Sequence, residues 1–173
     1  MKKILLISVF LLGFWTDSNA QIRKFLCTKV HDGDTFTVTF GGMEINCRIE
    51  AIDCPELSQA YGVSSRDSLV KYLLNKQIIV QFLKTDTYGR KLVNVWVTTL
   101  PQRIDYVIVA RGWGWYNSNY PPALPVSLDL ANLMASAQRN KLGLWGCDNQ
   151  VAPWDWRKYT AVQKRFIGTA CHW

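Results

Sequence analysis

The sequence predicts an α+β protein built on a small five-stranded β-barrel with helices packed against one side. Two patterns carry this prediction. Between residues 23 and 52, apolar and polar side chains alternate with the period of two that is typical of half-buried strands. Further along, the patterns give the order three strands, a helix, two strands and two helices. Five strands with helices on one side fit a closed barrel of the oligonucleotide-binding (OB) type.

The first strands are joined by a tight glycine turn. Phe36, Val38 and Phe40 alternate with threonines, as expected for a strand with one buried face. Gly41-Gly42 then predicts a hairpin turn into a strand over residues 43–52.

Serines are the expected caps of two helices. Ser64 or Ser65 can cap a helix that runs to about residue 74, and Ser127 can cap another through roughly residue 141. The remaining elements are strands over residues 77–82 and 91–97, a short helix over 104–111 that ends at Gly112, and a loop over 117–125.

The first twenty residues have the pattern of a secretory signal peptide. Lys2 and Lys3 form a positive start, residues 4–14 an apolar run, and residues 18–20 a small-residue end. A spanning helix needs about 20 apolar residues, so an uncleaved anchor is the weaker alternative. We therefore expect residues 21–173 to form one exported domain, periplasmic or secreted, without stable membrane association.

All five cysteines follow the predicted cleavage point, and export would bring them into an oxidising compartment. Because five is an odd number, at least one thiol stays unpaired within the chain. We favour a disulfide between Cys147 and Cys171, which would tie a Trp-rich tail that starts at about residue 146 to the domain. The pairing of Cys27, Cys47 and Cys54 stays open.

Negative charge is concentrated in one part of a positive chain. The net charge is +7, yet six of the thirteen acidic residues lie between positions 32 and 56. Asp34 and Asp53 are candidate metal ligands, because hard divalent cations prefer oxygen ligands. Capping of turns is the alternative for these aspartates, and it is the expected role of Asp32. The chain has no Cys-x-x-Cys pair, so the spacing gives no zinc site.

Three more charged residues suit the cleavage of a phosphodiester. Glu56, close to Asp53, can act as a general base for a metal-polarised water. Arg48 and Arg90 carry planar guanidinium groups that donate two parallel hydrogen bonds to phosphate. Ordinary surface ion pairs are the alternative for both arginines.

Three segments of the chain resemble the staphylococcal nuclease (thermonuclease) family. They are residues 30–35 (VHDGDT), 48–56 (RIEAIDCPE) and 86–90 (DTYGR), in the family's order and at about its spacing. The resemblance extends from about Cys27 to Trp145. It implies an OB-fold barrel of five strands with three α-helices. It also implies a calcium-dependent endonuclease that acts on DNA and RNA with little sequence preference and leaves 3′-phosphate ends.

The resemblance assigns roles position by position. Asp34 and Asp53 would bind Ca²⁺ through their side chains and Cys54 through its backbone carbonyl, although the family's prototype has threonine at that position. Thr87 replaces a lysine that helps to hold the nucleotide in the prototype. The implied catalytic residues are Arg48, Glu56 and Arg90, with the glutamate acting on the attacking water and the arginines on the scissile phosphate.

Aromatic residues before the last predicted helix are candidates for stacking on nucleic-acid bases. Trp115, Tyr116 and Tyr120 lie in this region, and aromatic faces stack on any base. Packing in the core or at its rim is the alternative for the first two. The expected substrate is single-stranded or locally opened DNA and RNA, and the expected state is a monomer. The rival hypothesis is an OB-fold module that binds nucleic acid but has lost catalysis.

Overall fold

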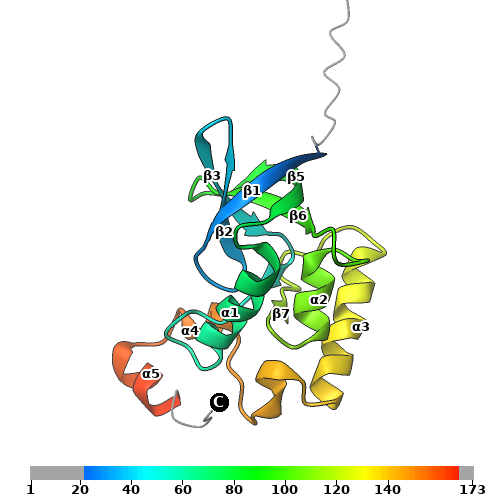
Figure 1. Ribbon diagram of the computed structural model, residues 1–173. Helices are drawn as coiled ribbons and strands as arrows, with labels where there is room; N and C mark the ends of the chain where they lie inside the picture. Colours follow the sequence, from blue (N-terminus) through cyan, green and yellow to red (C-terminus); the bar gives the residue numbers. More distant parts are fainter. Residues whose placement is uncertain (1–21, 168–173) are drawn as a thin grey trace, which may run out of the picture.

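The computed structural model describes residues 22–167, which form a closed β-barrel with helices at one end (Figure 1). Neighbouring strands follow the order β1-β2-β3-β6-β5; β3 and β6 pair in parallel and the other neighbours are antiparallel. This arrangement confirms the predicted five-stranded barrel. Its strands are β1 (Ile22–Val30), β2 (Thr35–Phe40), β3 (Met43–Ile49), β5 (Gln77–Thr85) and β6 (Lys91–Trp96).

Side chains that alternate along the strands fill the barrel. Phe36 and Val38 of β2 are fully buried, as are Val80 of β5 and Val95 of β6. Phe40 departs from this pattern, since 45% of its surface is exposed beside the Gly41-Gly42 turn. It packs at the barrel's rim against Phe25, with the two ring centroids 5.4 Å apart.

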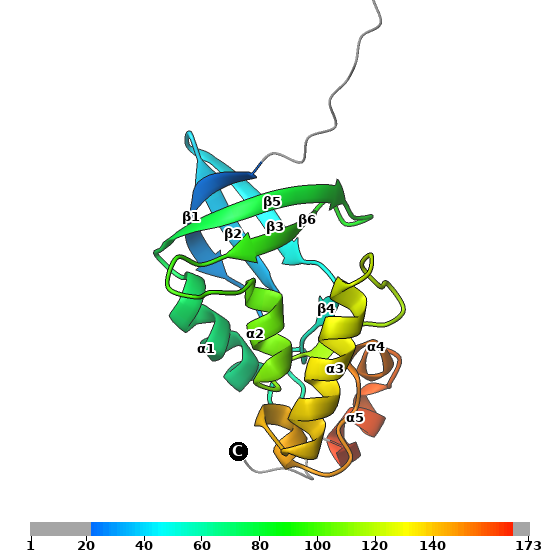
Figure 2. The ribbon, with the colours of Figure 1, turned by 90° about the vertical axis from the view of Figure 1, so that its right-hand side faces the viewer.

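Three main helices close one end of the barrel, and Figure 2 shows them side by side below it. They are α1 (Gly62–Leu73), α2 (Ile104–Ala110) and α3 (Val126–Arg139). Leu69, Ile108 and Leu130, one from each helix, are buried in the shared core. A two-stranded sheet that the sequence did not predict lies here as well, made of β4 (Ile52–Asp53) and β7 (Trp115–Tyr116).

The predicted serine caps are wrong. The α1 helix begins at Gly62, before Ser64 and Ser65, and has no side-chain cap. Ser65 is buried within the helix, where its hydroxyl donates to the Trp113 carbonyl at 2.6 Å. Ser127 also lies inside its helix, because α3 begins at Val126 and Pro125 occupies the N-cap position before it.

The C-terminal part of the described chain packs against the same end of the barrel. It contains the 3₁₀ turn η1 (Gly143–Gly146) and two short helices, α4 (Pro153–Trp156) and α5 (Ala161–Ile167). Trp156 is buried and Trp154 makes an edge contact with Trp115, with the ring centroids 5.7 Å apart. These two tryptophans therefore pack on the domain.

Several predictions concern residues at the two ends of the chain. The predicted signal peptide, Cys171 and Trp173 lie outside the described residues. Cys147 is disulfide-bonded, whereas Cys27, Cys47 and Cys54 are free thiols. Within residues 22–167, no helix has the length and apolar character needed to cross a membrane.

Candidate active site

An open groove of about 760 Å³ brings charged residues together from distant parts of the chain. It is lined by the end of β3, by β4, by the turn after β5 and by the segment after α4. The charged residues that matter most to its chemistry are Arg48, Asp53, Glu56, Asp86, Arg90 and Arg157.

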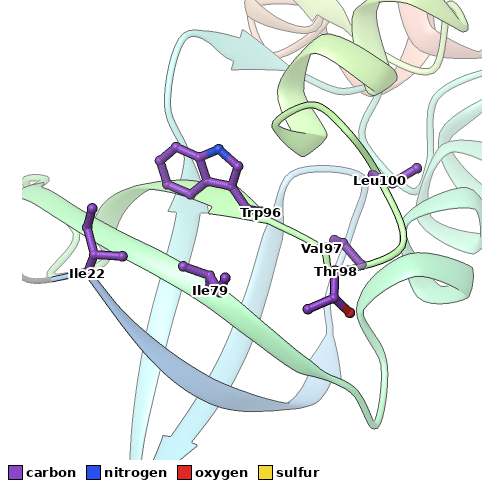
Figure 3. A pocket seen from close by; sticks show the side chains of 6 residues that line it. All are labelled: Ile22, Ile79, Trp96, Val97, Thr98 and Leu100. Atoms are coloured by element: carbon purple, nitrogen blue, oxygen red, sulfur yellow. The ribbon is translucent and has the colours of Figure 1, made fainter.

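A second hollow of about 380 Å³ lies on the outside of the barrel and differs in chemistry (Figure 3). Ile22, Ile79 and Trp96 contribute apolar surface to it, and none of its six lining residues is ionisable. The polar groove is therefore the candidate active site.

Asp34 is held next to the groove by a tight turn. The Asp32 side chain accepts the backbone N–H groups of Asp34 at 2.9 Å and Thr35 at 2.6 Å, so Asp32 has the predicted turn-capping role. A side chain at Gly33 would be excluded, because its Cβ would lie 2.1 Å from Ser65 Oγ. This packing places the Asp34 carboxylate where it accepts the Cys54 backbone N–H at 2.8 Å.

Arg48 lies between the two buried aspartates. Its Nη1 donates to Asp34 Oδ1 at 2.5 Å, and its Nη2 donates to Asp53 Oδ1 at 3.0 Å. Burial raises the pKa of Asp34 to about 7, although the positive charge of Arg48 opposes this shift. Burial alone would lower the pKa of Arg48, but the two carboxylates raise it above its usual value. Arg48 therefore stays charged at the inner wall of the groove.

The Cys54 side chain points into the core rather than into the groove. Its residue is 4% exposed, and burial raises the pKa of the thiol well above its usual value. A Cβ built at Gly114 would lie 2.5 Å from Cys54 Sγ, which shows how closely the backbone packs on this sulfur. The thiol is thus protonated at neutral pH and shielded from solvent.

Arg90 lies in the turn between β5 and β6, whose hydrogen bonds are made within the turn itself. Its Nε donates to Asp86 Oδ2 at 2.8 Å, and its Nη2 forms an ion pair with the same oxygen at 2.8 Å. The other carboxylate oxygen of Asp86 accepts the backbone N–H groups of Tyr88 and Arg90, each at 2.9 Å. Hydrogen bonds to the ionised form outweigh burial and lower the pKa of Asp86. The turn therefore fixes the guanidinium before any ligand arrives.

The comparisons with known proteins agree with this geometry. Residues 46–147 match the family model described as staphylococcal nuclease homologue. The chain belongs to the staphylococcal nuclease family. A Haemophilus influenzae protein named "uncharacterized endonuclease" is 32% identical over 168 residues, which cover 95% of this chain and 90% of that protein. "Protein ParB" of Escherichia coli is 30% identical, with 83% and 81% covered, and "Micrococcal nuclease" of Shigella flexneri is 29% identical, with 83% of each covered.

The aromatic residues of this staphylococcal nuclease homologue divide into two groups. Tyr120 lines the groove and is 75% exposed, whereas Tyr116 is buried in β7. Trp115 packs edge-on against Trp145, with ring centroids 4.3 Å apart, and does not line the groove. Tyr88 was not predicted as a stacking residue, but it lines the groove and is 82% exposed. Its position inside the 86–90 motif was the signal that could have identified it.

Arg157 is a groove residue that the sequence did not indicate. It follows α4, outside the residues matched to the family model. Its Nη2 donates to Asp53 Oδ2 at 2.5 Å, and its Nη1 donates to Glu56 Oε1 at 2.8 Å. Arg157 belongs to none of the three family motifs, so its place in the groove could not be predicted from the sequence.

The donor set suits a hard divalent cation. Asp34, Asp53 and Glu56 supply carboxylate oxygens, the ligand type that such cations prefer. Within residues 22–167, no three His, Cys, Asp or Glu side chains form a preassembled metal cluster. Guanidinium groups balance these carboxylates instead, with Arg48 on both aspartates and Arg157 on Asp53 and Glu56. In the described part of the chain, the charges of these carboxylates are thus balanced by arginines.

Proposed function

We propose that this chain is a calcium-dependent endonuclease that hydrolyses phosphodiester bonds of DNA and RNA with little sequence preference and leaves 3′-phosphate ends. The observation that carries the proposal is the groove, which the carboxylates of Asp53 and Glu56 line together with the guanidinium groups of Arg48 and Arg90. Membership of a nuclease family supports the same reaction class.

The two arginines bind the scissile phosphate. Each guanidinium can donate two hydrogen bonds to phosphate oxygens, and its charge stabilises the negative charge that grows on them as water attacks. Arg90 is oriented in advance by Asp86. Arg48 is fixed by Asp34 and Asp53, so it presents its charge at the inner wall.

The carboxylates have two different roles, calcium binding and proton acceptance. Asp34 and Asp53, with the Cys54 carbonyl, would hold calcium, which when bound supplies a Lewis acid for a phosphate oxygen. Glu56 is the more exposed carboxylate, at 38% of its side chain, and accepts the proton of the attacking water. The water oxygen bonds to phosphorus as the bond from phosphorus to the 5′ oxygen breaks. The 5′ oxygen takes a proton from solvent and leaves as a hydroxyl group, while the phosphate stays on the 3′ side.

The groove favours bases that are not paired in a duplex. Tyr88 and Tyr120 expose most of their surface there, and stacking on such rings requires an open base face. The net charge of +7 attracts a polyanion without reading its sequence. We propose that the protein acts as an exported monomer on single-stranded or locally opened nucleic acid.

Incubation of purified protein with single-stranded DNA, duplex DNA and RNA tests this function. We expect cleavage in calcium, none after addition of a calcium chelator, and recovery when calcium is restored. The ends are identified by whether a phosphatase must act before the 3′ ends can be extended. Binding without cleavage, under both reducing and oxidising conditions, would identify a silent OB-fold module instead.

A further inference from the structure

The C-terminal segment is anchored beside the candidate metal ligands. The side chain of Gln59 is buried and makes two hydrogen bonds. Its Nε2 donates to the Val151 carbonyl at 2.6 Å, and its Oε1 accepts the Glu56 backbone N–H at 3.2 Å. One side chain therefore joins the C-terminal segment to the loop that carries Glu56. The buried Trp156 fixes the next turn of the chain.

This anchoring places Arg157 directly over two carboxylates. Its Nη2 lies 2.5 Å from Asp53 Oδ2, and its Nη1 lies 3.3 Å from Asp53 Oδ1 and 2.8 Å from Glu56 Oε1. Both oxygens of a 1%-exposed aspartate are thus in contact with the same guanidinium. The same two residues are the proposed calcium ligand and the proposed general base.

We propose that Arg157 is a built-in counter-ion that competes with calcium for Asp53 and Glu56, so that the C-terminal segment sets the calcium concentration at which the site fills. This inference rests on the proposed function. A guanidinium and a divalent cation repel each other when they share a carboxylate, so one weakens the binding of the other. Contact of Arg157 with these carboxylates and calcium binding would therefore oppose each other.

The surroundings allow this exchange without loss of the fold. The Arg157 side chain is 46% exposed, so it can turn into solvent without uncovering the core. Asp53 keeps a second partner, because Arg48 donates to its Oδ1 at 3.0 Å. Removal of the Arg157 charge consequently leaves no buried carboxylate without a counter-charge.

Calorimetric titration of calcium into the protein, without nucleic acid, tests the inference. The variants are Arg157→Gln and the matched control Lys158→Gln, which removes the same charge one residue away. Lys158 is 71% exposed and pairs only with Asp155 among the described ion pairs. We expect Arg157→Gln to bind calcium about tenfold more tightly, the size expected from losing charged hydrogen bonds that compete with the metal. Lys158→Gln should stay within about twofold of the unaltered protein.

Equal or weaker calcium binding by Arg157→Gln would overturn the inference. If the unaltered protein still cleaves in calcium, the nuclease proposal survives that result. If no variant binds calcium and none cleaves, both proposals fall. Thermal unfolding shows whether each variant is folded. Should Arg157→Gln not fold, Arg157→Met provides the test: it keeps an unbranched side chain without the charge, so tighter calcium binding supports competition and unchanged binding refutes it.

Discussion

Glu56 and Arg90 are the two groove residues whose removal should cost the most activity. Glu56→Gln removes the proton acceptor and should lower the cleavage rate by about 10²–10⁴-fold. Arg90→Ala removes charge from the phosphate site and should lower it by about 10²–10³-fold. Single-turnover cleavage of a labelled oligonucleotide measures both effects.

Arg66→Ala is the matched control for the arginine. Arg66 lies on α1 and pairs with its neighbour Asp67, in a partly exposed position that does not line the groove. Its removal should leave the rate nearly unchanged. If Glu56→Gln and Arg90→Ala were as fast as this control, the assignment of the active site would be wrong.

The buried thiols should be unreactive in the folded protein. Burial raises the pKa to about 11 for Cys27 and about 12 for Cys47, and well above the usual value for Cys54. Thiolates, which react with alkylating agents, are therefore scarce at neutral pH. Mass spectrometry after treatment with iodoacetamide should find these cysteines unlabelled in native protein and labelled in denaturant. Rapid native labelling of Cys54 would contradict its placement in the core.

At the scale of single residues, contacts within a local motif could be predicted from the sequence, whereas contacts between distant residues could not. The turn formed by Asp32 could be predicted because its partners lie two and three residues away. Arg157 meets Asp53 across 104 residues of sequence, and nothing in the spacing encodes that contact. It depends on how the C-terminal segment docks, which is a tertiary event.

The turn between β5 and β6 is the element that positions Arg90. Asp86→Asn should weaken its contacts with Arg90 and with the two backbone N–H groups, and reduce cleavage by about tenfold through misplacement of the guanidinium. Single-turnover rates for Asp86→Asn, compared with those for Arg90→Ala, measure this effect. A rate equal to that of the unaltered protein would show that the turn does not position Arg90.

The same aspartate gives the turn a defined pH dependence. The pKa of Asp86 is lowered in the folded protein, so its stabilising effect is present above the ordinary value of 3.8 and is lost as the pH falls through the folded value. The difference in the free energy of unfolding between the unaltered protein and Asp86→Asn should therefore be constant near neutral pH and shrink in acid. Denaturant unfolding at a series of pH values measures it, and a difference that grew in acid would contradict the sign.

Helix α1 offers a further test, because its buried serine serves tertiary structure. Ser65→Ala removes the hydrogen bond to the Trp113 carbonyl and should destabilise the protein by about 1–3 kcal/mol. Ser127→Ala, in a helix without a side-chain cap, should change stability by less than about 0.5 kcal/mol. Denaturant unfolding compares the two, and equal losses would contradict the difference in their roles.

Most elements could be predicted because the hydrophobic pattern repeats with the period of a strand or a helix. The serine caps of α1 and α3 have no such repeat. Residues 104–110 form the expected helix, and residue 112 is a glycine with a φ of 66° just beyond it. A serine near a helix start has several possible partners, and only the packed structure selects one. For Ser65 that partner is a carbonyl 48 residues away.

The whole molecule combines a predictable barrel with a C-terminal segment that sequence patterns did not describe. The barrel and its three main helices follow from hydrophobic alternation and from the family motifs. Helix α4 has only four residues, too few for a clear periodic pattern, and α5 buries none of its residues, so its sequence carries no core-facing apolar stripe. Because this segment completes the groove with Arg157, the site could be predicted only in part.

Net charge predicts how the whole protein should respond to salt. Each groove cation that contacts a phosphate releases counterions from the bound strand, so the affinity for single-stranded DNA should fall as potassium chloride is raised. If Arg48, Lys84 and Arg90 each contact one phosphate, the logarithm of the binding constant should fall with the logarithm of salt with a slope of roughly −2. Fluorescence anisotropy of a labelled oligonucleotide in chelator, where cleavage is not expected, measures this slope.

Lys84→Gln separates the groove from the general surface charge. Lys84 lines the groove and its Nζ lies 3.7 Å from Glu50 Oε1, too far for a strong ion pair, so its charge is available to phosphate. The substitution should make the salt slope shallower by roughly 0.7 and weaken binding to all sequences alike. Arg66→Ala, which removes a charge away from the groove, should leave the slope nearly unchanged. A flat salt response in the unaltered protein would mean that nucleic acid does not bind through these cations, and equal changes in the two variants would place the binding surface elsewhere.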